Sequence, residues 1–498
     1  MKKIYAFIIL IMFNSLIIYA QWQPDLRLTN DPAFSLTAFN NAWSIAAEGN
    51  NVHVVCRDQR DGNDEIYYKM SSDGGSNWGA DTRLTNDLAT SRNPAISVSG
   101  SIVHIVWPDE RDGVGEIYYK RSTDNGLSWE PDIRLTDVLA YSGNSSLAVF
   151  GSSVHAVWED YRDLNQEIYY KHSTDSGQTW GTDIRLTNNS ALSWTPSIAA
   201  INSIVHLVWR DERDGNNEIY YKKSIDGGTN WGVDTRLTIN PSNSFSPSIA
   251  VYDSLVNIVW DDDRDGNSEV YYKRSSDSGS NWSPDIRLTN NIAFSSNPSI
   301  SVSDSIIHVV WEDTRDGNNE IYYKRSVDGG LNWEDDLRLT NNSSISSAVS
   351  VCSSLSAVHV VWNDNRDGNW EVYYKQNPSG NITGVENIVS ELPMQFQLEQ
   401  NYPNPFNPST SIQYQVSSDS HINLKVYDVI GNVVATLVNE EKPAGSYEVE
   451  FSAIGGSASG GNAYSLPSGI YFYQLSVEGP ETSSGQGFTQ TRKMILVK

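Results

Sequence analysis

The stretch VHIVWPDERDGVGEIYYKRSTDNGLSWEPDIRLT, residues 103–136, decides the fold because it returns along the chain in nearly the same wording. Residues 154–187 read VHAVWEDYRDLNQEIYYKHSTDSGQTWGTDIRLT, which is the same pattern 51 residues later. A constant period of this length predicts a repeat architecture. The histidine position of the block marks seven copies: His53, His104, His155, His206, Asn257, His308 and His359.

Each copy predicts four short strands separated by turns. An apolar stretch such as 95–98 comes first, and the histidine-bearing run that ends in Trp107 follows. The third strand carries Glu-Ile-Tyr-Tyr-Lys, as at 116–120, and the fourth runs from Trp129 to Thr136. Asp-Gly and Gly-rich turns separate the strands, as hairpins require. Four antiparallel strands per period are typical of one β-propeller blade.

The two ends of the repeat predict how the ring closes. The seventh copy stops after Lys375 without its fourth strand, and an orphan copy of that strand occupies residues 22–29. An N-terminal strand that completes the last blade removes the free edges of the ring. Residues 21–376 are therefore predicted to form a seven-bladed β-propeller closed by an N-terminal strand.

Six copies carry the pattern S-x-D-x-G-x-x-W between the third and fourth strands. This pattern resembles the Asp box, or BNR repeat, of sialidases and other Asp-box propellers. We expect a structural role, because Asp accepts backbone N–H bonds, Gly supplies positive φ and Trp packs under the turn. The pattern indicates a propeller and says little about activity. Its aspartates are Asp73, Asp124, Asp175, Asp226, Asp277 and Asp328.

Composition agrees with an all-β protein and excludes some partners. The chain has 16 Trp and 26 Tyr beside five Met, and such aromatic residues favour strands. Its 61 acidic and 35 basic residues give a net charge of −26, which repels nucleic acid. Two cysteines, Cys56 and Cys352, cannot form a disulfide framework or a thiolate metal site.

The N-terminus predicts export. Lys2 and Lys3 precede an apolar run over residues 4–18, and Ala20 precedes Gln21, as in a secretory signal. We expect residues 1–20 to be the signal peptide and no later segment to cross a membrane. The mature protein is then secreted and extracellular or attached to the outer-membrane surface, and its propeller is expected to be a monomer.

The repeat ends at Gln376, and a linker over residues 377–395 leads to a different domain at 396–498. Six stretches there have the strand lengths and turn boundaries of a small β-sandwich. The domain resembles the type A C-terminal sorting domain of the type IX secretion system. The resemblance implies the type IX machinery as a partner, while the Gly/Ser-rich insertion at 455–461 departs from the family. The motifs that carry it lie at 401–408, 426–428 with Gly431, 444–445, 468–471 and 493–498.

Strand parity predicts which turns share a face of the propeller. The Asp boxes lie at one end, whereas the second turn and the link to the next blade lie at the other, where propellers usually bind ligands. The second turn is D-x-R-D-G followed by Glu, as in Asp58, Arg60, Asp61 and Glu65. These oxygens permit a ring of Ca²⁺ loops. We favour a hairpin whose Arg pairs with the flanking carboxylates, and therefore expect no cofactor and no metal.

Six of the eight histidines form one strand column, in which Asn257 occupies the one remaining place. A side chain repeated around a ring cannot single out one substrate, so we assign the column to blade packing. Ligand-binding residues must instead break the symmetry. One such position, just before the first strand, holds Asn41, Arg92, Gly143, Trp194, Phe245, Ser296 and Ser347.

Trp194 and Phe245 on adjacent blades, with Arg92 two blades away, predict an aromatic and cationic patch suited to a sugar or an acidic glycan. Asn41, Tyr141 and Phe294 complete the predicted ligand-binding set. The alternative is ordinary loop drift between duplicated copies.

Three functions stay open at this point. The preferred one is a surface-displayed propeller that binds a glycan or a surface protein through its axial face. A sialidase-like or other glycan-cleaving enzyme is the second, although the Arg-Ile-Pro motif of sialidases is absent and no catalytic residue stands out. The third is a structural surface protein that binds no ligand.

Overall fold

The computed structural model describes residues 22–38, 44–354, 357–380, 396–401, 403–417, 420–442, 445–452, 466–478 and 488–497. The regular elements in these ranges are all strands, so the protein is all-β as predicted. Over the same ranges no helix has the length and apolar character needed to span a membrane. The predicted signal peptide, residues 1–20, lies outside the described residues. The chain divides into two compact units, Met1–Gly384 and Val385–Lys498.

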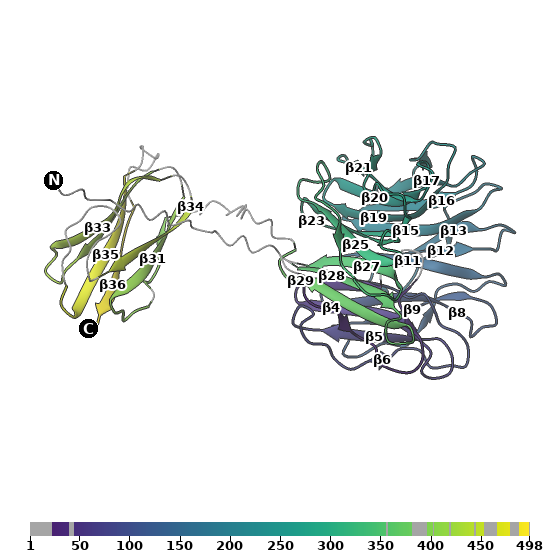
Figure 1. Cartoon of the computed structure of the whole chain (residues 1–498), viewed down its shortest axis with the longest axis horizontal. Coiled ribbons are helices and arrows are strands. Elements are labelled where there is room, and N and C mark those ends of the chain that lie inside the picture. Colours follow the sequence, from purple (N-terminus) through teal and green to yellow (C-terminus); the bar gives the residue numbers. More distant parts are fainter. Residues whose placement is uncertain are drawn as a thin grey trace, which may run out of the picture. The chain divides into compact units, whose positions relative to one another are not determined.

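The described part of the first unit contains seven antiparallel sheets that follow one another in chain order (Figure 1). The first strands are β3 (Ile45–Glu48), β7 (Ala95–Ser99), β11 (Ser142–Phe150), β15 (Ser193–Ile201), β19 (Ser244–Tyr252), β23 (Ser295–Ser303) and β27 (Ser346–Ser354). The second strands are β4 (Asn51–Asp58), β8 (Ile102–Asp109), β12 (Ser153–Asp160), β16 (Ile204–Asp211), β20 (Leu255–Asp262), β24 (Ile306–Asp313) and β28 (Ala357–Asp364). The third strands are β5 (Glu65–Ser71), β9 (Glu116–Ser122), β13 (Glu167–Ser173), β17 (Glu218–Ser224), β21 (Glu269–Ser275), β25 (Glu320–Ser326) and β29 (Glu371–Asn377).

The fourth strands are much shorter than the predicted run from Trp to Thr. Regular pairing is limited to two residues, because the Trp of each Asp box turns away to pack against the preceding sheet. These strands are β6 (Thr82–Arg83), β10 (Ile133–Arg134), β14 (Ile184–Arg185), β18 (Thr235–Arg236), β22 (Ile286–Arg287) and β26 (Leu337–Arg338). The first sheet also includes β2 (Ser35–Leu36), which pairs with β4.

The N-terminal strand β1 (Leu26–Arg27) lies where the sequence placed it, against the seventh sheet. Leu26 is opposite Tyr374 and Arg27 opposite Tyr373, the register that β10 has on β9. The first strands of successive sheets contact one another, and β27 contacts β3. All seven first strands also line one cavity of about 220 Å³. These relationships fit a β-propeller.

The core of this unit lies between successive sheets. Tyr68 of the first sheet, for example, packs with Ile105 and Trp107 of the second, and all three are almost fully buried. Burying one large apolar side chain contributes about 1.5–3 kcal/mol. Because the same cluster recurs between neighbouring sheets, the stability of each sheet depends on the next one.

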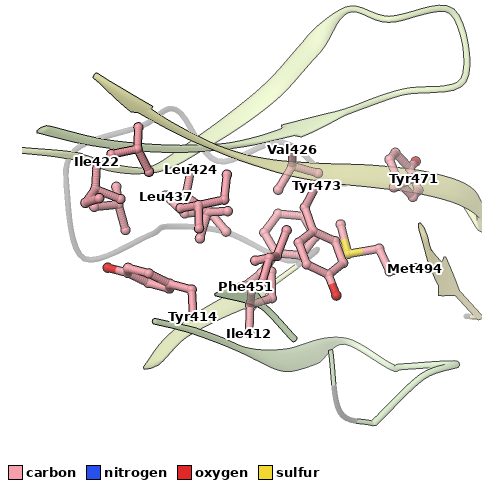
Figure 2. Packing of buried hydrophobic residues seen from close by; sticks show 14 of the residues in the cluster. Ile412, Tyr414, Ile422, Leu424, Val426, Leu437, Phe451, Tyr471, Tyr473 and Met494 are labelled. Carbon is pink, nitrogen blue, oxygen red and sulfur yellow. The ribbon is translucent and has the colours of Figure 1, made fainter. Parts of the chain in front are cut away.

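The second unit packs two sheets face to face. The sheets are β30 (Gln397–Leu398), β31 (Ser409–Val416) and β34 (Gly445–Ser452), and then β33 (Val433–Lys442), β32 (Ser420–Tyr427), β35 (Gly469–Glu478) and β36 (Phe488–Leu496). Ile412 and Tyr414 of the first sheet lie across from Leu424, Val426 and Tyr473 of the second (Figure 2). The alternation of buried and exposed residues along β32 places one face of each sheet in this core.

Candidate ligand-binding face

Two hydrogen bonds show which turns share an end of the first unit. Gly74 of an Asp box donates its N–H to the carbonyl of Asn50, in the turn between the first and second strands. At the other end, Glu110 of a D-x-R-D-G turn donates its N–H to Thr90 in the link between sheets. We call this second end, made of D-x-R-D-G turns and links, the link face.

The Asp boxes are built as turns. Asp73 accepts hydrogen bonds from Asn77 Nδ2 at 2.7 Å and from Asn77 N and Ser71 Oγ, each at 2.8 Å, and these donors lower the pKa of Asp73 to about 2. The equivalent bonds form at Asp124, Asp175, Asp226, Asp277 and Asp328. Trp78 packs edge-on against Tyr374 of the seventh sheet, with ring centroids 4.9 Å apart. Each box thus stabilises its own turn and the junction with the preceding sheet.

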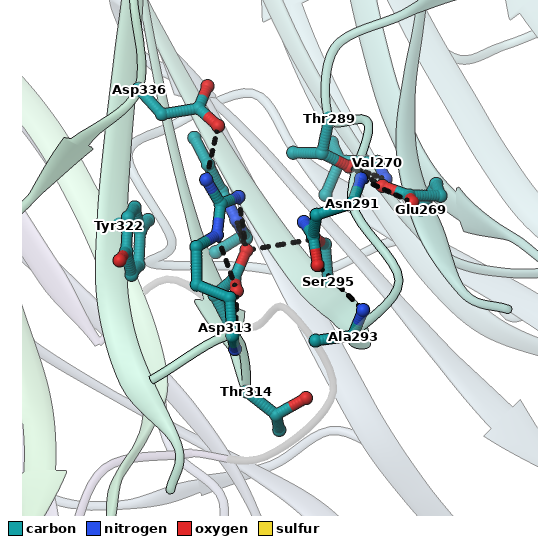
Figure 3. Close-up of polar contacts among 12 residues, drawn as sticks. Glu269, Val270, Thr289, Asn291, Ala293, Ser295, Asp313, Thr314, Tyr322 and Asp336 are labelled. Carbon is teal, nitrogen blue, oxygen red and sulfur yellow. Dashed lines mark hydrogen bonds and ion pairs between the residues drawn. The ribbon is translucent and has the colours of Figure 1, made fainter. Parts of the chain in front are cut away.

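In the D-x-R-D-G turns, a guanidinium group occupies the space between the carboxylates. Arg315 Nε and Nη2 donate to both oxygens of Asp313 at 2.8 and 2.6 Å, and Nη1 donates to Asp336 at 2.8 Å (Figure 3). The ring of Tyr322 lies 4.4 Å from the guanidinium carbon. Arg315 therefore supplies the positive charge that the Ca²⁺ alternative would have supplied.

The histidine column is internal to the sheets. His104 Nδ1 lies 2.7 Å from the hydroxyl of Tyr119, and burial lowers the pKa of His104 to about 3. In the fifth copy Tyr272 donates to Asn257 Oδ1 at 2.7 Å. Asn thus replaces His without loss of the tyrosine partner.

The predicted patch forms in part, but around a different cation. Trp194 and Phe245 both lie beside Arg210, whose guanidinium carbon is 3.5 Å from the Trp194 ring centroid and 5.3 Å from that of Phe245. Arg92 does not join them, because it forms an ion pair with Glu110. Trp194 and Phe245 lie inside their first strands and not before them, whereas Arg92 precedes its first strand as predicted. A β-bulge after Trp194 extends pairing with the second strand to this point.

The other members of the predicted set have other neighbours. Tyr141 packs edge-on against Tyr161, with ring centroids 6.0 Å apart. Phe294 is 59% exposed, and its backbone exchanges hydrogen bonds with Thr314. Asn41 lies outside the described residues.

A second position at which the copies differ was not among the predicted site residues. It is the penultimate residue of the second strand and holds Arg57, Pro108, Glu159, Arg210, Asp261, Glu312 and Asn363. We call it the divergent position. The 51-residue period aligns the copies at this position, but the surrounding strand is apolar and therefore reads as core.

Carboxylates at the divergent position accept a backbone N–H of the following sheet. Glu159 Oε1 accepts from Thr195 N at 2.6 Å, and Glu312 Oε1 accepts from Ala348 N at 2.8 Å. Asp261 Oδ1 accepts from Asn297 N at 3.3 Å. These carboxylates are at least 93% buried, and burial raises the pKa of Asp261 to about 6 and of Glu312 to about 7.

Comparison with known proteins shows a shared fold only. No protein-family model matches the chain, and no curated protein is similar to it. The solved structure of the polysaccharide lyase Uly1 superimposes with a TM-score of 0.51 at 7% identity, covering 72% of this chain and 99% of that one. Trypanosoma rangeli sialidase gives a TM-score of 0.44 at 10% identity, covering 82% of this chain and 85% of that one. At these identities the likeness concerns the fold alone.

Proposed function

We propose that this protein is an exported, surface-displayed β-propeller of seven blades that binds a glycan through its link face. The observation that carries the proposal is the meeting of Trp194 and Phe245 at Arg210, at two positions where the copies of the repeat differ. All three side chains are half-buried, so each keeps part of its surface open to solvent. Aromatic rings beside a cation offer a sugar both stacking and hydrogen bonds.

Three observations support closure of the ring. The strand β1 pairs with β29, β27 contacts β3, and Trp22 packs edge-on against Tyr323 with ring centroids 5.0 Å apart. Trp22 thereby repeats the contact that Trp78 makes with Tyr374. In a closed ring the divergent positions of all copies surround one axis, which concentrates their differences in one place.

Export and surface display rest on the two ends of the chain. The charge and apolar pattern of residues 1–20 supports secretion, and the motifs within 396–498 support transport by the type IX machinery. In cells that carry this machinery, deleting 396–498 should leave the propeller inside the outer membrane, as measured by surface biotinylation. Unchanged surface labelling of the deleted protein would contradict this route.

Glycan binding is tested by screening the full chain and its Trp194→Ala variant on a glycan array. We expect saturable binding that is lost in the variant while the thermal unfolding midpoint stays within a few degrees. The matched control is Phe150→Ala, which removes a 41% exposed aromatic ring from the opposite face. Retained binding by Trp194→Ala, or no binding by the unmodified chain, would contradict the proposal, and the latter favours a scaffold protein.

Glycan cleavage is a second candidate because of Asp261 and Glu312. Asn297 bridges them, with its N–H on Asp261 and its Nδ2 at 3.2 Å from Glu312 Oε1. Carboxyl groups whose pKa lies near neutrality can act as general acids. Turnover of fluorogenic sialosides or polysaccharides that is lost in Asp261→Asn and Glu312→Gln would establish cleavage, whereas turnover unaffected by both changes would exclude this pair.

A further inference from the structure

The boundary between the fourth and fifth sheets lacks the carboxylate acceptor found at the boundaries that follow the third, fifth and sixth sheets. Thr195, Ser246, Asn297 and Ala348 occupy one position of the repeat and share a φ of 48° to 51°. Thr195, Asn297 and Ala348 donate their N–H to a carboxylate at the divergent position of the preceding sheet. For Ser246, the divergent position of the preceding sheet holds Arg210, whose guanidinium group has hydrogen-bond donors only.

Arg210 also lacks a direct polar partner, although the carboxylates of Glu212, Glu159 and Asp261 lie near enough to act on its charge. It forms no hydrogen bond or ion pair with any residue that the structure describes, and its Nε is buried without a partner. Stacking on Trp194, its cross-strand neighbour, holds the side chain in place. Leaving a half-buried guanidinium unpaired costs free energy, which an anionic ligand would recover.

Arg57 shows that an arginine at this position need not be unpaired. It occupies the divergent position of the first sheet, but its Nη1 lies 3.1 Å from Asp64 Oδ2. Arg210 therefore differs from Arg57 in two ways. No carboxylate pairs with it as Asp64 pairs with Arg57, and two aromatic rings lie beside it.

We propose that the carboxylate of an acidic saccharide binds between Arg210 and the N–H of Ser246. The ligand would take the place that Glu159, Asp261 and Glu312 fill from within the chain at the boundaries after the third, fifth and sixth sheets. This inference rests on the proposed glycan binding and names its ligand class. Trp194 and Phe245 favour a saccharide over an acidic peptide, because the C–H faces of a sugar ring stack on aromatic rings.

The strong negative charge of the chain does not prevent such binding. At physiological ionic strength charges are screened over about 8 Å, so nearby groups decide the local potential. Three acids, Glu212, Glu159 and Asp261, act on Arg210 electrostatically, but none forms an ion pair with it. Glu159 already accepts hydrogen bonds from Asn144, Gln166 and Thr195.

The test is isothermal titration of the full chain with trigalacturonate and with its methyl ester, which has the same rings without the charge. Arg210→Glu is the decisive variant, because it installs the carboxylate found in the third and sixth sheets and so preserves the fold. We expect trigalacturonate to bind the unmodified chain about 10- to 100-fold more tightly than the ester. In Arg210→Glu we expect trigalacturonate to lose its advantage, so that the acid binds no more tightly than the ester.

Arg57→Gln is the matched control, since it removes an arginine from the same position of the repeat and should leave both affinities unchanged. Equal binding of acid and ester to the unmodified chain would overturn the inference and leave glycan binding intact. Failure of both saccharides and of the glycan array would instead contradict the proposed function. Binding of an aspartate-rich peptide, but of neither saccharide, would overturn the saccharide assignment.

Discussion

Thr195 donates its backbone N–H to Glu159 Oε1 at 2.6 Å, across the boundary between the third and fourth sheets. This bond joins a residue with positive φ to a carboxylate that is 99% buried. It therefore stabilises both the bulge in β15 and the contact between the sheets. The same bond forms at Glu312 and Ala348, where its contribution can be measured.

Replacing Glu312 by Ala should lower the free energy of unfolding by about 1–3 kcal/mol, because Ala348 N–H loses its acceptor. Glu312→Gln keeps an oxygen at the same place and should cost less than half as much. Urea unfolding at pH 7 measures both. Equal losses in the two variants would show that the hydrogen bond is not the cause.

The histidine column should make stability depend on pH. An unfolded histidine binds a proton below about pH 6.5, whereas burial holds the pKa of folded His104 at about 3. Protons then favour the unfolded chain, so this contribution to stability falls as the pH drops from about 6.5 toward 3.

His104→Asn isolates one member of the column, because Asn257 shows that Asn keeps the tyrosine partner. Relative to the unmodified chain, the variant should gain about 2 kcal/mol between pH 7 and pH 5. Urea unfolding at both pH values provides the comparison. A difference that does not change with pH would mean that His104 is accessible to protons in the folded state.

The docking of β1 can be tested through its ion pair. Arg366 Nη1 lies 2.7 Å from Asp25 Oδ2, just as Arg213 Nη1 lies 2.6 Å from Asp234 Oδ2 within the fourth sheet. Asp25→Ala and Asp234→Ala should each lower the free energy of unfolding, by about 1 kcal/mol. A loss in Asp234→Ala alone would show that the N-terminal strand is not docked.

Alanine variants of two neighbouring glycines in one Asp box distinguish the free-energy cost of a steric clash from that of backbone strain. A Cβ at Gly228 would lie 1.7 Å from the Tyr170 hydroxyl oxygen, whereas a Cβ at Gly227 meets nothing within 4 Å. Both glycines have positive φ, so each alanine variant pays the strain of that conformation. Gly228→Ala should be less stable than Gly227→Ala by about 1–3 kcal/mol in thermal unfolding. Equal stabilities would refute a close contact with Tyr170.

Binding of an acidic saccharide should weaken as the pH rises. Burial raises the pKa of Asp261 to about 6, so Asp261 becomes negatively charged near Arg210 above that pH. The carboxylate of the saccharide, with a pKa of about 3–4, stays ionised throughout. Titrations between pH 5 and 8 should show falling affinity for trigalacturonate, and Asp261→Asn should flatten the dependence. A flat profile in the unmodified chain would contradict this coupling.

The repeat predicted most of the fold because each copy contains its strands, turns and core residues in the same order. The additional copy of the fourth strand at residues 22–29 also predicted the partner of β1, since an unpaired strand must find a sheet edge. The prediction that Arg92 joins Trp194 and Phe245 was wrong for a physical reason. Arg92 and Trp194 are equivalent in the repeat, but equivalence does not bring two residues into contact.

Contact at this site depends on pairing within a sheet. Arg210 lies opposite Trp194 because a bulge shifts the register by one step, and an alternating pattern does not reveal such a shift. The carboxylates at the divergent position were missed for a related reason. A Glu within an apolar strand shows its role only when the N–H group that donates to it from the next sheet is known.

The pairing of Leu26 with Tyr374 has a consequence for biogenesis. The last sheet cannot be assembled until nearly the whole repeat region has left the ribosome, so its earliest-made strand must wait for its latest-made partner. Such a long-range contact slows folding and favours completion after synthesis. A chain that crosses a membrane from its N-terminus would therefore travel with its final sheet unassembled.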